Sequence, residues 1–105
     1  MIRCIMAETK LMDRLDRVSR KRGNGVLRRE VWIDEATGAV TRFNLAYINH
    51  SIFTGDNGRV VGFDNKHGFH HRHAKGTIEK IDFVSYQEIE QRFEDEWFAL
   101  RGEIR

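Results

Sequence analysis

The sequence contains no proline, only one cysteine, Cys4, and no apolar run that approaches the length of a membrane span. A lone cysteine cannot form an internal disulfide or a cysteine-based zinc site, so we assign Cys4 no role. A transmembrane helix needs roughly 20 consecutive apolar residues, and we therefore expect no integral membrane protein. Arg3 and Glu8 place charges where a secretory signal peptide requires a continuous apolar segment. These features predict a cytoplasmic protein.

The chain of 105 residues has the length of one domain with one hydrophobic core. Hydrophobic residues make up 40% of the sequence and charged residues 32%, which is typical of a globular protein. No repeat or low-complexity linker divides the sequence. We predict a single domain over residues 1–105.

The net charge is only +2, but the charges are unevenly distributed. Eight Lys or Arg residues and two Asp residues lie between Lys10 and Arg29, whereas the segment from Glu88 to Glu96 is acidic. A basic segment attracts phosphate backbones through Coulomb attraction and counterion release. We therefore consider Arg20, Lys21 and Arg22 as candidate contacts to nucleic acid or to an acidic partner. The alternative is a solvated surface without a partner.

Residues 8–20 admit two interpretations. Leu11, Leu15 and Val18 recur at helical spacing among charged residues, which favours a short amphipathic helix. Alternatively, residues 15–22 form a strand, because the Gly-Asn-Gly sequence that follows is a tight-turn signal before an extended segment.

Four later segments have the short length, the alternation and the flanking turn signals of β-strands. They are residues 26–34, 40–49, 59–63 and 77–84. Strands in this meander order imply an antiparallel sheet.

The C-terminal segment predicts a helix over residues 85–101. Ser85 and Glu88 have the spacing of a capping box. Five large apolar residues then follow at steps of three and four and form one stripe that must cover a sheet face. They are Tyr86, Ile89, Phe93, Trp97 and Leu100. The predicted fold class is therefore α+β: a four- or five-stranded antiparallel meander sheet covered by a C-terminal amphipathic helix, with the N-terminal segment as a helix or an extra strand.

Four of the five histidines lie within seven positions, at His67, His70, His71 and His73. Histidine suits acid–base catalysis because its ordinary pKa lies near neutral pH. In one interpretation, these imidazoles act as general base and general acid on a ribose 2′-OH and a leaving 5′-oxygen. Arg72, Arg59 or Lys75 would then stabilise the negative charge of the transition state, and Asp64 would orient an imidazole.

Two other interpretations stay open. The histidine spacing also suits a transition-metal site with Asp64 as an oxygen ligand. Against it, residues 70 and 71 of an extended segment point to opposite faces, and Arg72 would repel a dication. In the third interpretation, the histidines only cap strand ends and bond to the backbone. We assign the isolated His50 a structural or surface role.

Three stretches carry a resemblance to a known family. They are Phe43-Asn-Leu-Ala-Tyr-Ile-Asn49, Gly58-Arg-Val-Val-Gly-Phe-Asp-Asn-Lys-His-Gly-Phe-His-His-Arg-His73 and Phe83-Val-Ser-Tyr-Gln-Glu, followed by an acidic helix with Phe93 and Trp97. Over residues 24–100 the chain resembles the TumE family of bacterial toxin–antitoxin proteins, which show a Tyr-Asp-Asn, Gly, His-Arg-His order in the same place. Phe63 stands where that family usually has Tyr, and the N-terminal segment is longer and more basic than in many relatives.

The resemblance implies the toxin of a type II toxin–antitoxin module whose cognate antitoxin carries a helix-turn-helix domain. The shared motif positions are Asp64, Asn65, Gly68, His71, Arg72 and His73. Small toxins with one or two helices against a four-stranded antiparallel sheet commonly resemble the RelE-like ribonucleases, and this is an analogy of architecture only.

We therefore expect a toxin that acts on RNA as an endoribonuclease without a metal or another cofactor. The expected catalytic residues are His71, His73, His70, Arg72 and Asp64. The expected substrate-binding residues are Arg59, Asn65, His67, Lys75, Arg20, Lys21 and Arg22. The expected partners are RNA and the helix-turn-helix antitoxin, in a homodimer or a toxin–antitoxin hetero-oligomer, with no membrane.

Two alternatives come from other functional classes. One is a non-catalytic module that binds nucleic acid or protein and thereby inhibits growth or regulates transcription. Its binding would survive substitution of the histidines and would weaken steeply with salt. The other is an enzyme that depends on a metal held by the histidines.

Overall fold

A computed structural model describes residues 7–100, apart from the side chain of His67. Cys4 and Arg3 lie outside the described residues, as does Arg101 at the end of the predicted helix. Within residues 7–100, no helix combines the length and the apolar character needed to cross a bilayer.

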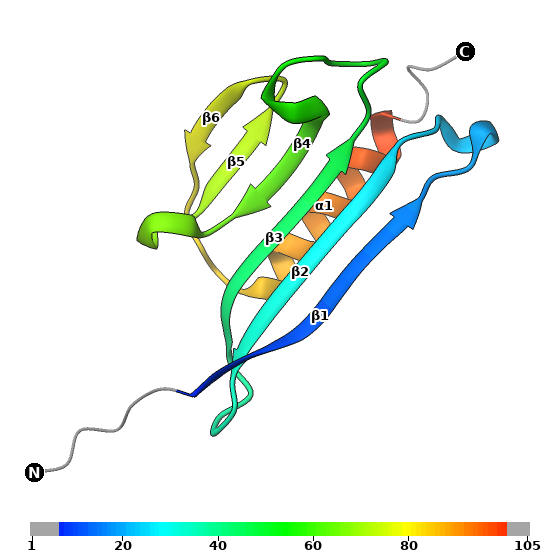
Figure 1. The fold of residues 1–105 in the computed structure, drawn as a ribbon. Helices are drawn as coiled ribbons and strands as arrows, with labels where there is room; N and C mark the ends of the chain where they lie inside the picture. The colour runs from blue at the N-terminus through cyan, green and yellow to red at the C-terminus, as the bar shows by residue number, and fades with distance from the viewer. Residues whose placement is uncertain (1–6, 101–105) are drawn as a thin grey trace, which may run out of the picture.

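The described chain forms one antiparallel sheet and one α-helix, which confirms the predicted α+β class (Figure 1). The strands lie side by side in chain order and each pairs only with its sequence neighbours. They are β1 (Glu8–Arg17), β2 (Val26–Asp34), β3 (Val40–Ile48), β4 (Arg59–Asp64), β5 (His71–Ala74) and β6 (Thr77–Lys80). The helix is α1 (Tyr86–Leu100).

The N-terminal segment is a strand along its whole described length, so the helical interpretation of residues 8–20 is wrong. β1 pairs in antiparallel register with β2 from Glu8 opposite Asp34 to Arg17 opposite Val26. The strand interpretation of residues 15–22 is correct in kind but wrong in extent. A short 3₁₀ turn at Arg20–Arg22 instead ends in Gly23, whose φ of 109° reverses the chain.

The sheet also gains a strand inside the histidine-rich segment, where the sequence predicted a loop. β5 pairs on one side with β4 and on the other with β6. β6 ends at Lys80, so residues 81–84 form the connection to α1 and are not part of a strand as predicted. The sheet therefore has six strands where four or five were expected.

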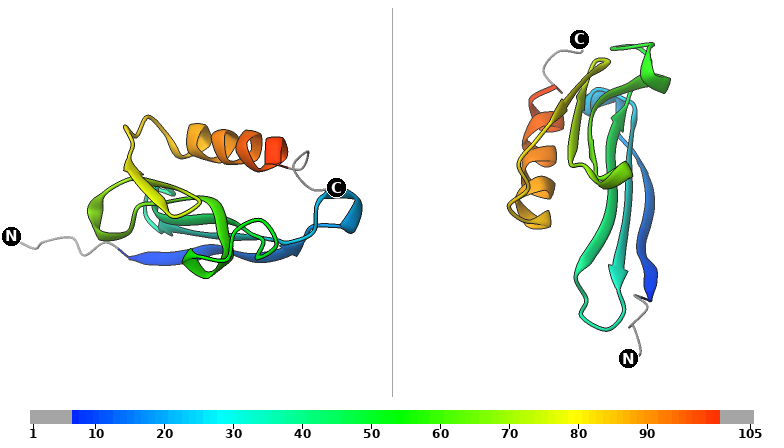
Figure 2. Two further views of the ribbon diagram at one scale, coloured as in Figure 1. Left: turned by 90° about the horizontal axis from the view of Figure 1, so that it is seen from above. Right: turned by 90° about the vertical axis from the view of Figure 1, so that its left-hand side faces the viewer.

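α1 covers one face of the sheet, chiefly over β3 and β4 (Figure 2). Ile89, Phe93 and Trp97 of the predicted stripe are buried, and Tyr86 and Leu100 pack at its ends. They meet the buried residues of β2, β3 and β4, which include Leu27, Phe43, Leu45, Tyr47, Val61 and Phe63. The Ser85 hydroxyl accepts a hydrogen bond from the Glu88 N–H at 3.1 Å, as a capping residue does. Side chains of the opposite parity on each strand lie on the other face, away from α1.

Candidate functional site

A pocket of about 610 Å³ lies on the sheet face opposite α1. This volume falls within the range of ordinary small-ligand pockets. The pocket is lined by Glu30, Trp32, Arg42, Phe43, Asn44, Arg59, Asp64, Asn65, Lys66, His71, His73 and Ile78. Five of the residues that the sequence nominated therefore meet here, namely Arg59, Asp64, Asn65, His71 and His73.

Strand register explains why these side chains converge. Glu30 of β2 lies opposite Asn44 of β3, Asn44 lies opposite Asp64 of β4, and Asp64 lies opposite His71 of β5. Residues in register across neighbouring strands project to the same face, so these four form a polar row across the sheet. His73 is two positions beyond His71 on β5 and projects to that face as well.

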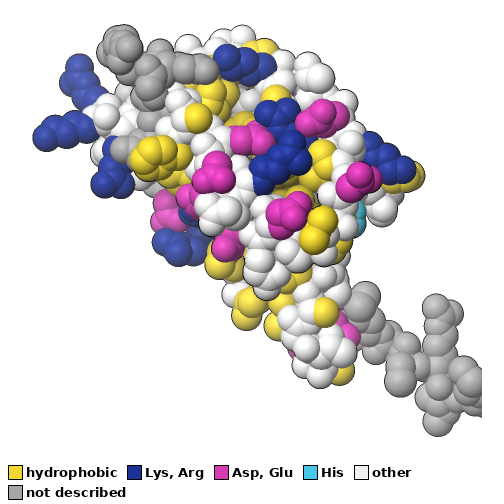
Figure 3. All heavy atoms as spheres, turned by 180° about the vertical axis from the view of Figure 1, so that it is seen from behind, with side chains coloured by type: hydrophobic (Ala, Val, Ile, Leu, Met, Phe, Trp, Pro, Cys, Tyr) yellow, Lys and Arg dark blue, Asp and Glu magenta, His cyan; other side chains and the backbone are white. Residues whose placement is uncertain are grey.

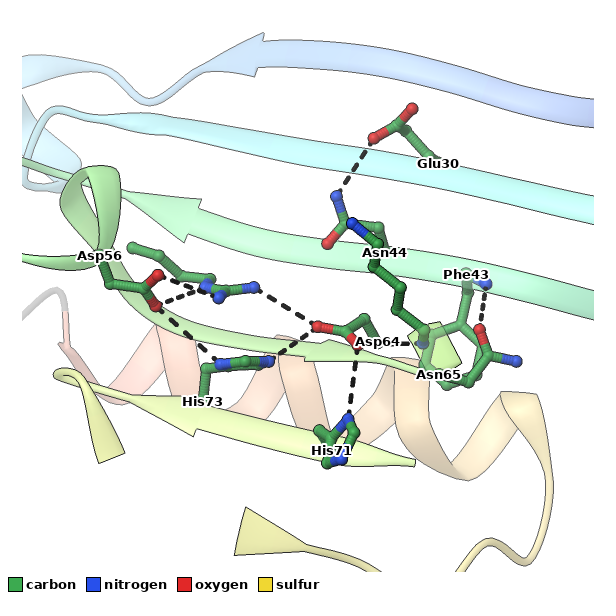
Figure 4. Close-up of polar contacts among 10 residues, drawn as sticks. Glu30, Phe43, Asn44, Asp56, Asp64, Asn65, His71 and His73 are labelled. Carbon is green, nitrogen blue, oxygen red and sulfur yellow. Dashed lines mark hydrogen bonds and ion pairs between the residues drawn. The ribbon is translucent and has the colours of Figure 1, made fainter. Parts of the chain in front are cut away.

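Asp64 is the centre of the polar network (Figure 4). One carboxylate oxygen lies 2.8 Å from His73 Nε2 and accepts a hydrogen bond from Arg59 at 3.5 Å. The other oxygen lies 3.7 Å from His71 Nδ1 and accepts a hydrogen bond from the Lys66 N–H at 3.1 Å. A single carboxylate therefore faces both imidazoles of the expected acid–base pair.

Arg59 is held by a second carboxylate that sequence reasoning did not select. Asp56 accepts hydrogen bonds from Arg59 at 2.8 Å and 3.1 Å. Asp56 has a φ of 49° and the following Asn57 a φ of 53°, a conformation that L-residues rarely adopt. The Gly-Asp-Asn-Gly sequence predicts this turn. It does not predict that the Asp56 side chain bonds to Arg59 at the start of β4.

The two imidazoles have different environments. The His73 side chain is only 9% exposed, and its ring lies between Asp64 and Asp56, with Nδ1 4.0 Å from an Asp56 oxygen and without a hydrogen bond to any described residue. The His71 side chain is 24% exposed and lines the pocket. His71 is therefore the imidazole placed to contact a ligand, whereas His73 is placed to fix Asp64.

Asn65 lies at the pocket, but its amide bonds to the backbone of β3. Its side-chain oxygen accepts a hydrogen bond from the Phe43 N–H at 3.0 Å, and its NH₂ group donates to the Thr41 carbonyl at 2.9 Å. Asn65 thus joins the end of β4 to the start of β3. This bonding argues for a structural role and against the predicted contact with substrate.

His70 and Arg72 lie on the opposite face, so the expectation that they act beside His71 and His73 is corrected. Successive residues of a strand point to opposite faces, which sends these two toward α1. Arg72 donates a hydrogen bond to Glu96 of α1 at 2.8 Å and another to Glu79 of β6 at 3.3 Å. On this side, Lys and Arg side chains are interleaved with Asp and Glu side chains (Figure 3).

The His70 ring stacks on Phe83, with ring centroids 4.2 Å apart, and also lies near Phe43. Burial lowers the pKa of His70 from its ordinary value because it disfavours the charged ring, and the neighbouring His71 lowers it further. His70 is therefore a packing residue of the helix side.

The other predicted site residues lie away from this pocket or outside the part of the chain that the structure describes. Lys75 lines a second, smaller cavity of about 310 Å³ beside the end of α1. Arg20, Lys21 and Arg22 form the exposed 3₁₀ turn between β1 and β2, at the opposite edge of the sheet from β5. The side chain of His67 lies outside the described part of the chain. Gly68, a shared motif position, has a φ of 78° and open space around its Cα, so it serves the turn before β5.

Sequence reasoning also missed the pocket residues of β2 and β3. Glu30, Trp32, Arg42 and Asn44 alternate with the buried residues of those strands, which is the signal that could have identified them as one surface. Glu30 accepts hydrogen bonds from Asn44 at 3.1 Å and from Lys10 at 2.7 Å. The bond from Lys10 holds the pKa of Glu30 below its ordinary value, so this carboxylate stays charged at neutral pH.

Among the side chains that the structure describes, which leave out that of His67, no three His, Cys, Asp or Glu residues gather in an arrangement that could hold a metal ion. His70, just before β5, lies on the helix side and stacks on Phe83, whereas His71 and His73 of β5 face the pocket, so the histidine spacing does not produce a shared ligand set from these three rings. The pocket offers instead a hydrogen-bonded set of two carboxylates, two imidazoles and a guanidinium.

Comparison with known proteins gives no neighbour from which to transfer a function. A scan against protein-family models finds no matching family. Neither the curated proteins nor the solved structures contain a significant match to the chain.

Proposed function

We propose that this protein is the toxin of a type II toxin–antitoxin module and cleaves RNA endonucleolytically with its own side chains. The observation that carries the proposal is the convergence of His71 and His73 on Asp64 in a pocket that also holds Arg59 and Lys66. An imidazole oriented by a carboxylate is a common proton-transfer group, and adjacent cations suit a phosphodiester. The resemblance to the TumE family supplies the toxin assignment, the helix-turn-helix antitoxin and a cytoplasmic site of action.

The proposed reaction is an internal transesterification. Neutral His71 accepts the proton of a ribose 2′-OH, and the 2′-oxygen attacks the adjacent phosphorus. The bond from phosphorus to the 5′-oxygen breaks, which leaves a 2′,3′-cyclic phosphate and a 5′-hydroxyl. The Lys66 ammonium, which lines the pocket, supplies the proton for the leaving oxygen and positive charge for the phosphoryl oxygens.

Asp64, His73, Arg59 and Asp56 position the reacting imidazole. Asp64 lies 3.7 Å from His71 Nδ1 and stabilises the imidazolium that forms when the ring accepts a proton. His73 and Arg59 fix the Asp64 carboxylate, and Asp56 fixes Arg59. His73 is thus a positioning residue here, a narrower role than the acid–base role that the sequence suggested.

The test is cleavage of a mixed RNA substrate by purified protein in the presence of a chelator. We expect His71→Ala to lower the rate roughly 100-fold or more, as loss of a general base does, and Asp64→Asn to lower it by at least about tenfold. His70→Gln is the matched control, because His70 lies on the other face, and it should retain the wild-type rate. Full activity of folded His71→Ala, with thermal melts showing intact protein, would refute the assignment of His71.

The toxin assignment has its own test. Expression of the wild-type chain should arrest growth, and co-expression of the product of the neighbouring gene should relieve the arrest and co-purify with the chain. A chain that cleaves RNA in vitro but neither inhibits growth nor binds that product would contradict the toxin–antitoxin proposal and leave the nuclease proposal intact.

The second candidate function is non-catalytic binding of nucleic acid. It is favoured by one observation, the exposed Arg20–Arg22 turn, whose three cationic side chains make no ion pair with another described residue. Clustered cations without acidic partners suit a phosphate backbone. This candidate differs from the first because it keeps its binding and its biological effect when His71 is replaced.

A further inference from the structure

At the end of the pocket away from β5, the indole of Trp32 lies within cation–π distance of two cations. Arg42 of β3 and Lys10 of β1 lie opposite Trp32 from its two neighbouring strands. The Arg42 guanidinium carbon lies 4.2 Å from the Trp32 ring centroid, and the Lys10 nitrogen lies 4.9 Å from it. Both distances are within the range of cation–π contact. The indole is thus flanked by a cation from each side.

The guanidinium plane of Arg42 is fixed by a second contact. Its Nε donates to both carboxylate oxygens of Glu8, at 3.1 Å and 3.2 Å, and Glu8 also accepts a hydrogen bond from Thr41 at 2.6 Å. The bonds from Thr41 and Arg42 hold the pKa of Glu8 below its ordinary value, so the ion pair persists at neutral pH. The carboxylate therefore holds the guanidinium beside the indole.

Part of this side chain is open to solvent at the pocket. The Arg42 side chain is 54% exposed, and both Arg42 and Trp32 line the pocket that contains His71. An arginine with a fixed plane loses less conformational freedom when a flat ligand stacks on it than a freely rotating one does. The arrangement is therefore a preformed stacking surface.

We propose that this surface holds an unpaired nucleobase, so that the pocket takes single-stranded RNA with one base stacked on Arg42 and a neighbouring phosphate at His71. The inference rests on the proposed function and adds the substrate class and a positioning contact. RNA-binding proteins stack splayed bases on aromatic rings and on guanidinium planes. A base inside a duplex is already stacked on its neighbours and cannot reach such a surface.

The spacing between the two ends of the pocket agrees with this substrate. Arg42 precedes Asn44 by two residues, and Asn44 is two strands from His71. With a rise of ~3.3 Å per residue and a strand spacing of ~4.8 Å, the Cα atoms of Arg42 and His71 are about 12 Å apart. A nucleoside and an adjoining phosphate can bridge that separation.

The test measures binding separately from cleavage. The probe is a short fluorescein-labelled oligonucleotide with 2′-O-methyl riboses, whose blocked 2′-oxygen prevents the proposed reaction. We expect the single strand to bind about tenfold more tightly than the same strand in a duplex, because only an unpaired base can stack on Arg42; tenfold corresponds to ~1.4 kcal/mol.

Substitutions separate stacking from charge. Arg42→Lys keeps the positive charge and removes the plane, so it should weaken single-strand binding about as much as Arg42→Ala, by roughly tenfold. Trp32→Phe should weaken it less than Trp32→Ala. Arg14→Ala is the matched control, because this exposed arginine of β1 does not line the pocket, and its affinity should be unchanged.

The outcomes also separate this inference from the proposed nuclease. If RNA is cleaved but Arg42→Lys and both Trp32 variants bind and cleave as the wild type does, the stacking surface is refuted and the nuclease stands. If no RNA is cleaved but the single strand binds the wild type and binds the Arg42 and Trp32 variants more weakly, the stacking surface is supported and the nuclease proposal is refuted. Equal affinity of wild type for single strand and duplex would overturn the inference.

Discussion

His71 and His73 share one face of β5, while Arg72 and the preceding residue His70 lie on the helix side. This two-residue period divides the histidine-rich segment into two chemical environments. On the pocket face, the imidazoles lie 2.8 Å and 3.7 Å from oxygens of Asp64. On the helix side, His70 lies against Phe43 and Phe83, where a charged ring is disfavoured. Neighbouring residues of one motif therefore lie in different environments, one polar and one apolar.

The lowered pKa of His70 predicts a loss of stability in mild acid. Above the ordinary histidine pKa of ~6.5 the ring is neutral in both the folded and the unfolded chain. As the pH falls below that value, the unfolded chain binds a proton that the folded chain resists, so acidification favours unfolding. We expect wild type to lose more unfolding free energy between about pH 7.5 and pH 5.5 than His70→Phe, which keeps the ring stacking.

Urea unfolding at both pH values measures this difference. His50→Phe is a suitable control, because His50 is exposed on the turn after β3 and belongs to neither histidine environment. Identical pH dependence of wild type and His70→Phe would show that His70 binds protons equally in both states. That result would contradict the assignment of His70 to a desolvated site.

At the scale of elements, the local pattern determined some strands and not others. β2, β3 and α1 alternate or repeat their apolar residues over nine or more positions, and their predicted bounds agree with the structure within two residues. In β1, Leu11 and Leu15 are 64% and 61% exposed, so their helical spacing reflects no buried stripe. Pairing with β2 makes this segment a strand; the Gly-Asn-Gly turn indicated such a pairing, but the sequence of residues 8–17 did not indicate its extent.

In the histidine-rich segment, too, the local sequence did not predict the strand pairing, and this affected both β5 and the site. β5 has only four residues, too few for a pattern, and its pairing with β4 creates the contact between Asp64 and His71. The sequence could nominate Asp64, Arg59, His71 and His73 by their chemistry. It could not separate them from Arg72, because that separation depends on whether the segment is extended. The pocket residues of β2 and β3 required the register of the whole sheet.

At Gly62 of β4, the pairing with β3 leaves little room for a side chain. A Cβ at Gly62 would lie 2.7 Å from the Leu45 carbonyl oxygen of β3 and 2.9 Å from Cδ of Arg59. The Arg59 side chain therefore crosses the strand over the space that a glycine leaves, on its way to Asp64. We expect Gly62→Ala to destabilise the fold by about 1–3 kcal/mol, as overpacking does, and to weaken the hold of Arg59 on Asp64. Denaturant unfolding measures the first effect.

A double-mutant cycle with Arg59→Ala isolates the second effect. Removing the Arg59 side chain relieves one of the two close approaches, so Gly62→Ala should cost less in that background than in the wild type. The approach to the Leu45 carbonyl remains and sets a residual cost. Strict additivity would mean that the arginine does not pass over Gly62 in solution.

At the scale of the whole molecule, the cationic groups occupy separate regions with different partners. On the helix side, Arg72 and Arg92 pair with Glu79 and Glu96, so their charges are compensated (Figure 3). At the pocket, Arg59 and Arg42 are bound by Asp56 and Glu8. The Arg20–Arg22 turn has no such compensation among the described residues and projects beyond the end of β1. It is therefore the region whose field should act most strongly on a polyanion.

This distribution predicts two separable contributions to RNA affinity. Replacing Arg20, Lys21 and Arg22 together by Gln should weaken binding of a 2′-O-methyl single strand and lower the slope of log K against log salt by ~0.7 for each phosphate that the turn no longer neutralises. Pocket substitutions such as Arg42→Lys should reduce affinity with little change in slope, because they keep the charge. Titrations at several salt concentrations measure both quantities.

The two contributions also decide between the two candidate functions. If the nuclease operates, the turn variant should cleave more slowly at low RNA concentration but reach the wild-type rate at saturation, because the turn lies away from His71 and contributes only binding. The non-catalytic alternative predicts instead that growth inhibition is abolished in the turn variant and fully retained in His71→Ala. The nuclease proposal predicts the opposite for His71→Ala, which should lose growth inhibition together with cleavage. Growth inhibition is therefore measured for the two variants side by side, with Arg14→Gln as the charge control. This comparison separates a protein that cleaves RNA from one that only binds it.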